Sequence, residues 1–303
     1  MFLFRLSGLF PFTFQVLPEV NLFPTRLAVY YHIFLMTIVV ISGFYIGVPS
    51  IYKHIIVGEK QFDRILQIAE VAMETLIVGI ILMYNLLNRK DFVVFTWRIL
   101  RADEVAGNSR LIYNFKPLRK KWIVLFVTYI VLWVILIVTD YSEFPYPSEP
   151  IAWFLVYCVA PAIIVIFIVQ YILAVGLIHR RMKALNEPIM QHLEVAEPRG
   201  RCAPAEAVID DLIVDELQNW IAVHDELYEA TATVTDFYSF PILLVIGYIC
   251  YTIIFVSFYA VKDVCRNELD RVLIGVVNDF TWIFVVISPV AVLLFMIEST
   301  IAE

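Results

Sequence analysis

Long uncharged blocks dominate this sequence. The clearest one, at residues 151–178, reads IAWFLVYCVAPAIIVIFIVQYILAVGLI and contains no Asp, Glu, Lys or Arg. A helix needs about 20 such residues to cross the hydrocarbon core of a bilayer. Hydrophobic residues make up 61% of the 303-residue chain and charged residues 17%, whereas soluble domains average about 45–50% and about 25%. We therefore predict an all-α integral membrane protein that is embedded in a lipid bilayer.

Six blocks of this kind predict a polytopic membrane helical bundle with six transmembrane helices. The predicted spans are 27–50, 66–87, 122–140, 151–178, 237–261 and 273–297. Pro161 lies inside the fourth span and predicts a kink, because proline removes a helical hydrogen bond and clashes with the preceding turn. We expect residues 1–303 to form a single membrane domain.

Lys and Arg are distributed unevenly among the predicted loops. The N-terminus and the alternate loops that share its side carry sixteen of them, and the opposite side carries six. Positive residues are retained on the cytoplasmic side of a membrane, so the N-terminus is predicted to be cytoplasmic, and with six spans the C-terminus is too. A cytoplasmic N-terminus argues against a G-protein-coupled receptor, whose N-terminus is outside.

The loop between the fourth and fifth spans is long and has helical character at both ends. We predict a cytoplasmic helical hairpin over residues 179–236 that extends spans 4 and 5. Its second arm carries a stripe with spacings of three and four, made of Ile209, Ile213, Leu217, Trp220, His224, Leu227 and Thr231. This face either packs on helices of the same chain or also packs between subunits. On the second interpretation, the candidate interface residues are Leu217, Trp220, His224 and Leu227.

Two carboxylates interrupt the second span. Glu70 and Glu74 are four residues apart, so they share one helical face in the outer half of the span. A carboxylate in a span normally faces a polar interior or a water-filled cavity. Either these two lie close enough to the interface to be hydrated, or they line a ligand pocket that opens outward. The aromatic residues that could line the same pocket are Trp133, Trp153, Tyr157, Tyr251 and Trp282.

Motifs for catalysis or cofactor binding do not stand out. The sequence has no nucleophile elbow, phosphate-binding loop or zinc-protease motif, and His224 and Asp225 are helical neighbours that do not face each other. No Cys/His spacing predicts a metal site, and no basic stripe predicts nucleic-acid binding. We therefore expect no enzyme activity, no cofactor and no metal.

Three features resemble the insect gustatory receptors, a family of seven-span chemoreceptors. The segment RLSGLFPF at residues 5–12 is similar to the family's pattern of a basic residue, a glycine and an apolar-proline pair before span 1. The N-terminus is predicted to be inside. A polar helix with a His-x-x-Leu step, His224 to Leu227, leads into an apolar helix at FYSFPILL, and Asp236 stands where the family usually has Asn.

This resemblance implies a taste receptor that is a ligand-gated cation channel subunit in the plasma membrane of sensory neurons. It implies a homo- or hetero-tetramer, a small-molecule tastant as ligand, and an outward-opening ligand pocket in each subunit. The family's seventh span carries a Thr-Tyr pair and a Gln-Phe pair and lines the pore. This sequence stops at LLFMIESTIAE, so it looks like a receptor that is cut before that helix.

Other interpretations of the sequence remain open. A small-molecule transporter would need internal repeats or broken helices, and neither is evident. A multipass membrane enzyme would need clustered histidines or carboxylates, whereas the five histidines are scattered along the chain. A chain without the pore helix could also be a non-conducting receptor fragment or a subunit that depends on others.

Overall fold

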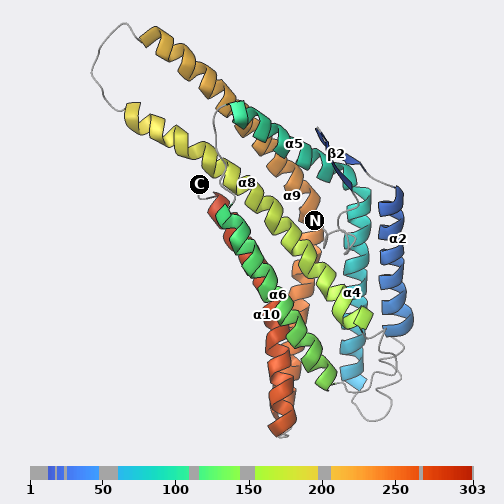
Figure 1. Ribbon diagram of the computed structural model, residues 1–303. Helices are drawn as coiled ribbons and strands as arrows, with labels where there is room; N and C mark the ends of the chain where they lie inside the picture. Colours follow the sequence, from blue (N-terminus) through green and yellow to red (C-terminus); the bar gives the residue numbers. More distant parts are fainter. Residues whose placement is uncertain are drawn as a thin grey trace. The chain divides into compact units, whose positions relative to one another are not determined.

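The computed structural model describes residues 13–17, 19–23, 26–47, 61–108, 116–143, 154–196, 206–265 and 269–301, and most of them are helical (Figure 1). The helices are α2 (Arg26–Ile41), α4 (Gln61–Leu87), α5 (Arg89–Asn108), α6 (Lys116–Glu143), α8 (Ala160–Ala196), α9 (Glu206–Cys265) and α10 (Leu269–Ile301). Two π-helical stretches, η1 (Ser42–Gly47) and η3 (Leu155–Val159), continue α2 and precede α8.

A short hairpin near the N-terminus adds two strands to the predicted helical fold. Strand β1 (Thr13–Leu17) pairs antiparallel with β2 (Glu19–Phe23), with Thr13 opposite Phe23 and Val16 opposite Val20. Polar and apolar residues alternate through most of both segments, and this period of two is typical of a strand. No strand was predicted here, because the two segments are short and lie in front of the first long apolar block.

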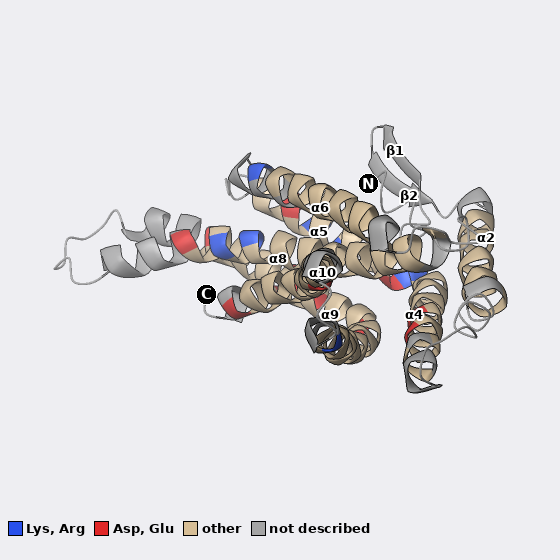
Figure 2. Ribbon diagram, turned by 90° about the horizontal axis from the view of Figure 1, so that it is seen from below, with Lys and Arg blue, Asp and Glu red and all other residues tan. Residues whose placement is uncertain are grey.

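Where the structure describes the predicted spans, they lie on helices. Among the described residues, four helices are long and apolar enough to cross a membrane, over Ile68–Leu87, Tyr157–Glu187, Glu216–Tyr259 and Gly275–Glu298. The first and third predicted spans coincide with shorter apolar helices at Val29–Tyr45 and Phe126–Thr139. Figure 2 shows long stretches of α8 and α10 without a charged residue. The chain is a membrane helical bundle, and the number of six spans stays a prediction.

Helix α9 is a single helix of 60 residues from Glu206 to Cys265. At about 1.5 Å per residue it is about 90 Å long, three times the roughly 30 Å thickness of a hydrocarbon core. Its first half carries the charged residues of the predicted hairpin and its second half is apolar. Only part of α9 can therefore lie in lipid, as the sequence predicted. The tip of the predicted hairpin, residues 197–205, lies outside the described residues.

The backbone changes its hydrogen-bonding pattern immediately before Pro161. The π-helical stretch η3 ends at Val159, and α8 begins at Ala160. Proline has no N–H to donate to the carbonyl one turn earlier, and single turns of π-helix occur where a regular helical bond cannot form. The structure thus has a π-helical turn on the N-terminal side of Pro161, and the kink itself stays a prediction.

The chain divides into two compact units. Unit 1 comprises residues Met1–Arg89, Lys120–Gln170 and Ser239–Val292, and unit 2 comprises Lys90–Arg119, Tyr171–Tyr238 and Leu293–Glu303. Helices α8 and α9 each contribute one part to both units. Our expectation of a single membrane domain remains a prediction.

Unit 1 has an apolar core that brings α6, α8 and α10 together. Tyr129, Leu136, Val165 and Val285 are buried in one cluster. Two hydrogen bonds connect α6 to α10: the hydroxyls of Tyr129 and Ser288 lie 2.6 Å apart, and the Thr139 hydroxyl donates to Asn278 Oδ1 at 2.7 Å. Pairing of this kind satisfies polar groups that would otherwise be exposed to lipid.

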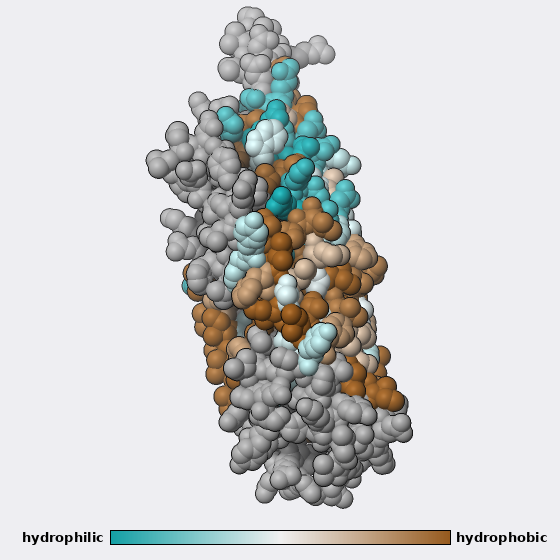
Figure 3. All heavy atoms as spheres, turned by 90° about the vertical axis from the view of Figure 1, so that its right-hand side faces the viewer, coloured by the Kyte–Doolittle hydropathy of each residue, from teal (hydrophilic) through white to brown (hydrophobic). Residues whose placement is uncertain are grey.

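Large apolar side chains cover much of the outer surface of unit 1. Helix α6 exposes Ile123, Val127, Val131 and Val134, and α10 exposes Phe280 and Phe284. Figure 3 shows a broad hydrophobic area on one face of the molecule. A soluble monomer rarely exposes large continuous apolar patches, whereas lipid is as apolar as these side chains. The exposed surface of unit 1 is therefore suited to a bilayer.

In unit 2, parts of α5, α8 and α9 carry buried stripes. The stripe on α9 consists of Trp220, Val223, Leu227, Ala230 and Val234, with spacings of three and four. The stripe on α5 consists of Phe95, Ile99, Ala102 and Ala106, and the one on α8 of Ala174, Ile178, Arg181 and Leu185. Several alanines lie in these stripes, and small residues let helices approach closely.

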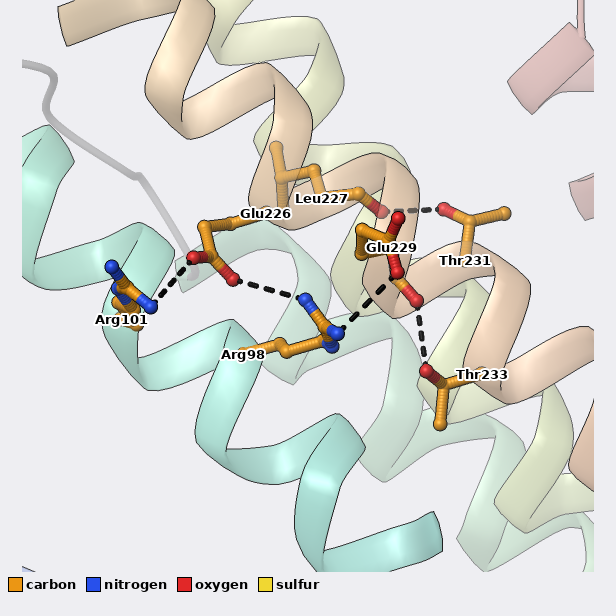
Figure 4. A network of polar contacts seen from close by, with 7 residues as sticks. All are labelled: Arg98, Arg101, Glu226, Leu227, Glu229, Thr231 and Thr233. Carbon is orange, nitrogen blue, oxygen red and sulfur yellow. Dashed lines mark hydrogen bonds and ion pairs between the residues drawn. The ribbon is translucent and has the colours of Figure 1, made fainter.

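Ion pairs connect the same three helices. Arg98 on α5 lies 3.4 Å from Glu226 and 3.3 Å from Glu229 on α9, and Arg101 lies 3.1 Å from Glu226 (Figure 4). Arg181 on α8 donates two hydrogen bonds of 2.7 Å to the two carboxylate oxygens of Asp103 on α5. Bidentate pairs of this geometry are among the strong polar contacts in proteins. Arg98 and Arg101 lie between the second and third predicted spans, where they were counted only as positive charges of a loop. In the structure both arginines connect α5 to α9.

Candidate functional site

The candidate ligand site begins with Glu74 on α4. Its side chain is buried, with 3% of the residue exposed, in a span where most neighbours are apolar. Oε1 of Glu74 has no hydrogen-bond partner among the residues that the structure describes. Burying a carboxylate is costly unless the group is paired. This carboxyl group therefore has unused capacity to accept a hydrogen bond.

Glu70 lies one helical turn before Glu74. The two carboxyl groups are close enough to repel each other, as expected from their spacing of four on one helix. Glu70 is less deeply buried than Glu74. The structure thus confirms that the two share a face of α4, and it places the deeper carboxylate further along the span.

Helix α9 supplies the other polar groups of the site. The hydroxyl of Tyr251 donates a hydrogen bond of 3.0 Å to the carbonyl oxygen of Leu66, one turn before Glu70 on α4. Tyr248 is buried and lies within electrostatic range of both carboxyl groups. Thr252, one turn after Tyr248, is also buried, and its hydroxyl interacts with the hydroxyl of Tyr248. Two helices far apart in the sequence therefore bring five polar side chains to one region of unit 1.

Tight packing of η1 fixes the position of α4 beside Glu74. Thr75 is buried against Gly43 of η1, and a Cβ atom added to Gly43 would lie 2.0 Å from the Thr75 hydroxyl oxygen. No side chain larger than hydrogen fits there without movement of a neighbour. The segment that follows α2 therefore holds the turn of α4 that carries Glu74.

The other predicted ligand residues are not shown to lie beside Glu74. Trp133 on α6 and Trp282 on α10 contact each other edge to face, with ring centroids 6.0 Å apart, and both pack against the core of unit 1. Tyr157 is partly buried in η3, and Trp153 lies outside the described residues. The structure brings Glu70, Glu74 and Tyr251 together, and the two tryptophans form a separate aromatic pair.

The four predicted interface residues occupy two faces of α9. Trp220 and Leu227 are buried within the chain itself, whereas Leu217 is 42% exposed and the side chain of His224 is 56% exposed. Leu217 and His224 belong to a second, exposed stripe with Val214, Ile221 and Tyr228. The predicted stripe therefore combines residues from two faces of α9. One face is buried against other helices of the chain, and the other is exposed.

Sequence reasoning missed Tyr248 and Thr252. The signal that could have found them is the buried stripe of α9, which continues from Val234 through Pro241, Val245 and Tyr248 to Thr252 at spacings of three, four or seven. A threonine on the buried face of a membrane helix must find a partner in the protein or in a ligand.

Comparison with known proteins places the whole chain in one family. The sequence model of the family described as 7tm Chemosensory receptor matches residues 1–302. A search of curated proteins found no match for this chain. The match covers both units, including the helices that carry Glu70, Glu74 and Tyr251.

Proposed function

The chain belongs to the chemosensory receptor family, and from that premise we propose that it is a gustatory receptor, a subunit of a ligand-gated cation channel that responds to small tastants. The family is one of membrane proteins with small-molecule ligands and is not an enzyme family. The taste-type assignment draws its support from RLSGLFPF before the first span and from the His224 to Leu227 step that leads into FYSFPILL. Residence in the plasma membrane of sensory neurons is part of the same proposal.

The proposal includes a topology with six spans in this chain and a cytoplasmic N-terminus. The sixteen-to-six distribution of Lys and Arg supports this orientation. With that orientation α4 runs from outside to inside, so Glu70 and Glu74 lie in the outer half of the span. A ligand that arrives from outside would then meet Glu70 first and Glu74 deeper in the bundle.

The observation that carries a ligand-binding role is the buried carboxyl group of Glu74. Its unpaired oxygen lies in an apolar span, beside polar groups of a second helix. Intramembrane ionisable residues are expensive, and they mark functional sites more often than structural ones. Ligand sites are mostly apolar, with a few convergent polar groups, and this arrangement has that composition.

Channel activity requires assembly of several subunits, and the exposed stripe of α9 offers a surface for it. Val214, Leu217, Ile221, His224 and Tyr228 follow one another at spacings of three and four and are all exposed. Such a regular apolar stripe on a partly polar helix is the kind that packs against another helix. We place the contact between subunits of a homo- or hetero-tetramer on this face.

The deciding experiment is electrical recording from cells that express the chain, alone and together with other receptor subunits, during application of a tastant panel. Unitary current steps that depend on ligand would support a ligand-gated channel. Ligand-dependent flux without unitary steps would favour a transporter. Saturable ligand binding without any current would indicate a non-conducting receptor subunit. An N-terminal tag that is accessible without permeabilisation would overturn the proposed topology.

A further inference from the structure

We propose that the basic segment at the start of α6, residues 116–121 with the sequence KPLRKK, binds the headgroups of anionic phospholipids at the membrane surface. The partner is a lipid surface and not a soluble molecule. This inference goes beyond the proposed receptor function. It rests on the third predicted span and on the proposed orientation, and not on the tastant, the channel activity or the site beside Glu74.

The basic segment has a high density of positive charge. Four of its six residues are basic: Lys116, Arg119, Lys120 and Lys121. The first turn of α6 contains no acidic residue, and residues 105–139 contain neither Asp nor Glu. Clusters of about four to eight Lys and Arg at the cytoplasmic end of a transmembrane helix are typical of binding to anionic lipids. The composition of the basic segment therefore matches a lipid-binding segment.

Other positive side chains of the structure have carboxylate partners. Arg98 and Arg181 form ion pairs with Glu226 and Asp103 in unit 2. Lys120 is the residue of the basic segment whose side chain the structure describes. It is exposed and forms no ion pair with any other described residue. The charge of Lys120 is thus available to an anion from outside the chain.

One face of α6 continues from the basic segment into an exposed apolar stripe. Lys116, Arg119 and Lys120 share this face, because they are spaced by three and four residues. At further spacings of three and four, the same face carries the exposed residues Ile123, Val127, Val131 and Val134. Lipid tails are as apolar as these side chains. The positive charges therefore lie at the end of a helix face that is suited to lipid along its length.

The position of the basic segment along α6 corresponds to the headgroup layer. Residues 122–139 carry no charge. At about 1.5 Å per residue they extend about 27 Å, close to the roughly 30 Å of the hydrocarbon core. The headgroup layer adds roughly 5–8 Å on each side, and the basic segment extends about 9 Å. With the proposed orientation this end of α6 is cytoplasmic, and the cytoplasmic leaflet carries anionic lipids.

The basic segment is unfavourable for α6 itself. The first turn of a helix carries a partial positive charge, so Lys and Arg there lower the stability of the helix. A lipid phosphate group is attracted both by the basic side chains and by the backbone N–H groups of such a turn. The four basic residues are therefore better explained by an anionic surface than by the stability of α6.

The test compares phosphatidylserine with phosphatidylcholine of the same acyl chains. Native mass spectrometry of the full chain, released from an uncharged detergent, measures the affinity for single lipid molecules. We expect phosphatidylserine to bind at least about tenfold more tightly, because each Lys or Arg near an anionic lipid adds to the affinity. Glycerophosphoserine, the same headgroup without acyl chains, should not compete at equal concentration, because the lipid tails also contact the apolar stripe of α6.

A neutral and a charge-conserving variant identify the residues. The neutral variant combines Lys116→Gln, Arg119→Gln, Lys120→Gln and Lys121→Gln and should lose the preference for phosphatidylserine. The charge-conserving variant combines Lys116→Arg, Lys120→Arg and Lys121→Arg and should keep it. Lys120→Gln alone should reduce the preference by a smaller factor than the neutral variant. The thermal unfolding midpoint of each variant without added lipid shows whether it is folded.

Three results would overturn the proposal. Equal affinities of the unaltered chain for the two lipids would exclude a preference for anionic headgroups. A preference that the neutral variant retains in full would assign phosphatidylserine to another surface of the protein. Competition by glycerophosphoserine at equal concentration would indicate a site for a soluble anion. None of these results depends on tastant binding or current, so the proposed receptor function is tested separately.

Discussion

Each unit of this protein contains a pair of glutamates on one helical face, and the two pairs have opposite surroundings. In unit 2, Glu226 and Glu229 on α9 are met by Arg98 and Arg101 of α5 (Figure 4). In unit 1, Glu74 beside Glu70 on α4 has no cationic partner in the described structure. The charges of unit 2 thus join helices, whereas Glu74 has no cationic partner among the residues that the structure describes.

The difference shows how the same residue type can serve stability in one place and function in another. A paired carboxylate contributes to the packing of its own unit. An unpaired buried carboxylate lowers the stability of a protein, and such a residue is retained where activity depends on it. If this contrast is correct, breaking pairs in unit 2 should destabilise the protein, and neutralising Glu74 should not.

The largest effect is expected from Asp103→Ala in unit 2. The substitution removes both hydrogen bonds that Asp103 accepts from Arg181, whose side chain is only 6% exposed. A buried charge that loses its partner costs about 3 kcal/mol of unfolding free energy. Thermal unfolding in detergent, followed by tryptophan fluorescence, should show a clearly lower midpoint.

The control for this prediction is Glu104→Ala, at the next position along α5. Glu104 is exposed, and substitutions of exposed residues away from special features change stability by about 0.5 kcal/mol or less. Equal unfolding midpoints for the two variants would mean that the Asp103–Arg181 pair does not hold unit 2 together.

A second prediction concerns the packing that positions Glu74 in unit 1. In Gly43→Ala the new Cβ atom would lie 2.0 Å from the Thr75 hydroxyl oxygen, so η1 and α4 must separate. Overpacking of this kind costs about 1–3 kcal/mol. We expect a lower unfolding midpoint together with weaker ligand binding, because Glu74 precedes Thr75 on the same helix.

A double-mutant cycle isolates the cause of that effect. Thr75→Ala removes the two nearest atoms that the added Cβ would meet, so Gly43→Ala should cost less in the Thr75→Ala background. Gly107→Ala is the matched control, since a Cβ there would meet nothing within 4 Å. Additive effects of Gly43→Ala and Thr75→Ala would contradict a direct clash.

Much of the helical architecture could be predicted from the sequence, and the reason is physical. Apolar blocks of about 20 residues have few alternatives to a membrane helix, so the blocks near α4, α8, α9 and α10 were located correctly. Helix α5 was missed because its exposed face is rich in Arg and Lys, and because its ion-pair partners Glu226 and Arg181 lie on segments that are distant in the sequence. A charge pattern alone does not show which helix provides the partner.

The candidate site was predictable only in part. Glu70 and Glu74 are conspicuous because charges are rare in spans, and their shared face follows from their spacing. That Tyr251 reaches Leu66, and that Tyr248 and Thr252 join the site, depends on the register of α9 against α4. Trp133 and Trp282 were grouped with the site because aromatic residues near span ends are compatible with many roles, and the structure uses them to pack α6 against α10.

The two smallest expected effects compare Glu74 with Glu226 directly, because the two substitutions should change the unfolding free energy in opposite directions. Glu74→Gln replaces a buried, unpaired carboxyl group with a neutral side chain of the same shape. We expect it to raise the unfolding free energy of the ligand-free protein by about 1 kcal/mol, since burial of an unpaired charged group is unfavourable. Glu226→Gln weakens contacts to Arg98 and Arg101 and should lower the unfolding free energy by about 1 kcal/mol, as for a partly exposed ion pair.

The measurement is thermal unfolding of Glu74→Gln, Glu226→Gln and the control Glu104→Gln in the same detergent. It shows whether the first two substitutions change stability in opposite directions. A lower midpoint for Glu74→Gln would contradict the contrast, because it would mean that this carboxyl group already has a stabilising partner in the free protein. A higher midpoint for Glu74→Gln together with a weaker response to a tastant would assign both the instability and the ligand binding to this carboxyl group. The instability that Glu74 causes without a ligand would then contribute to its affinity for the ligand.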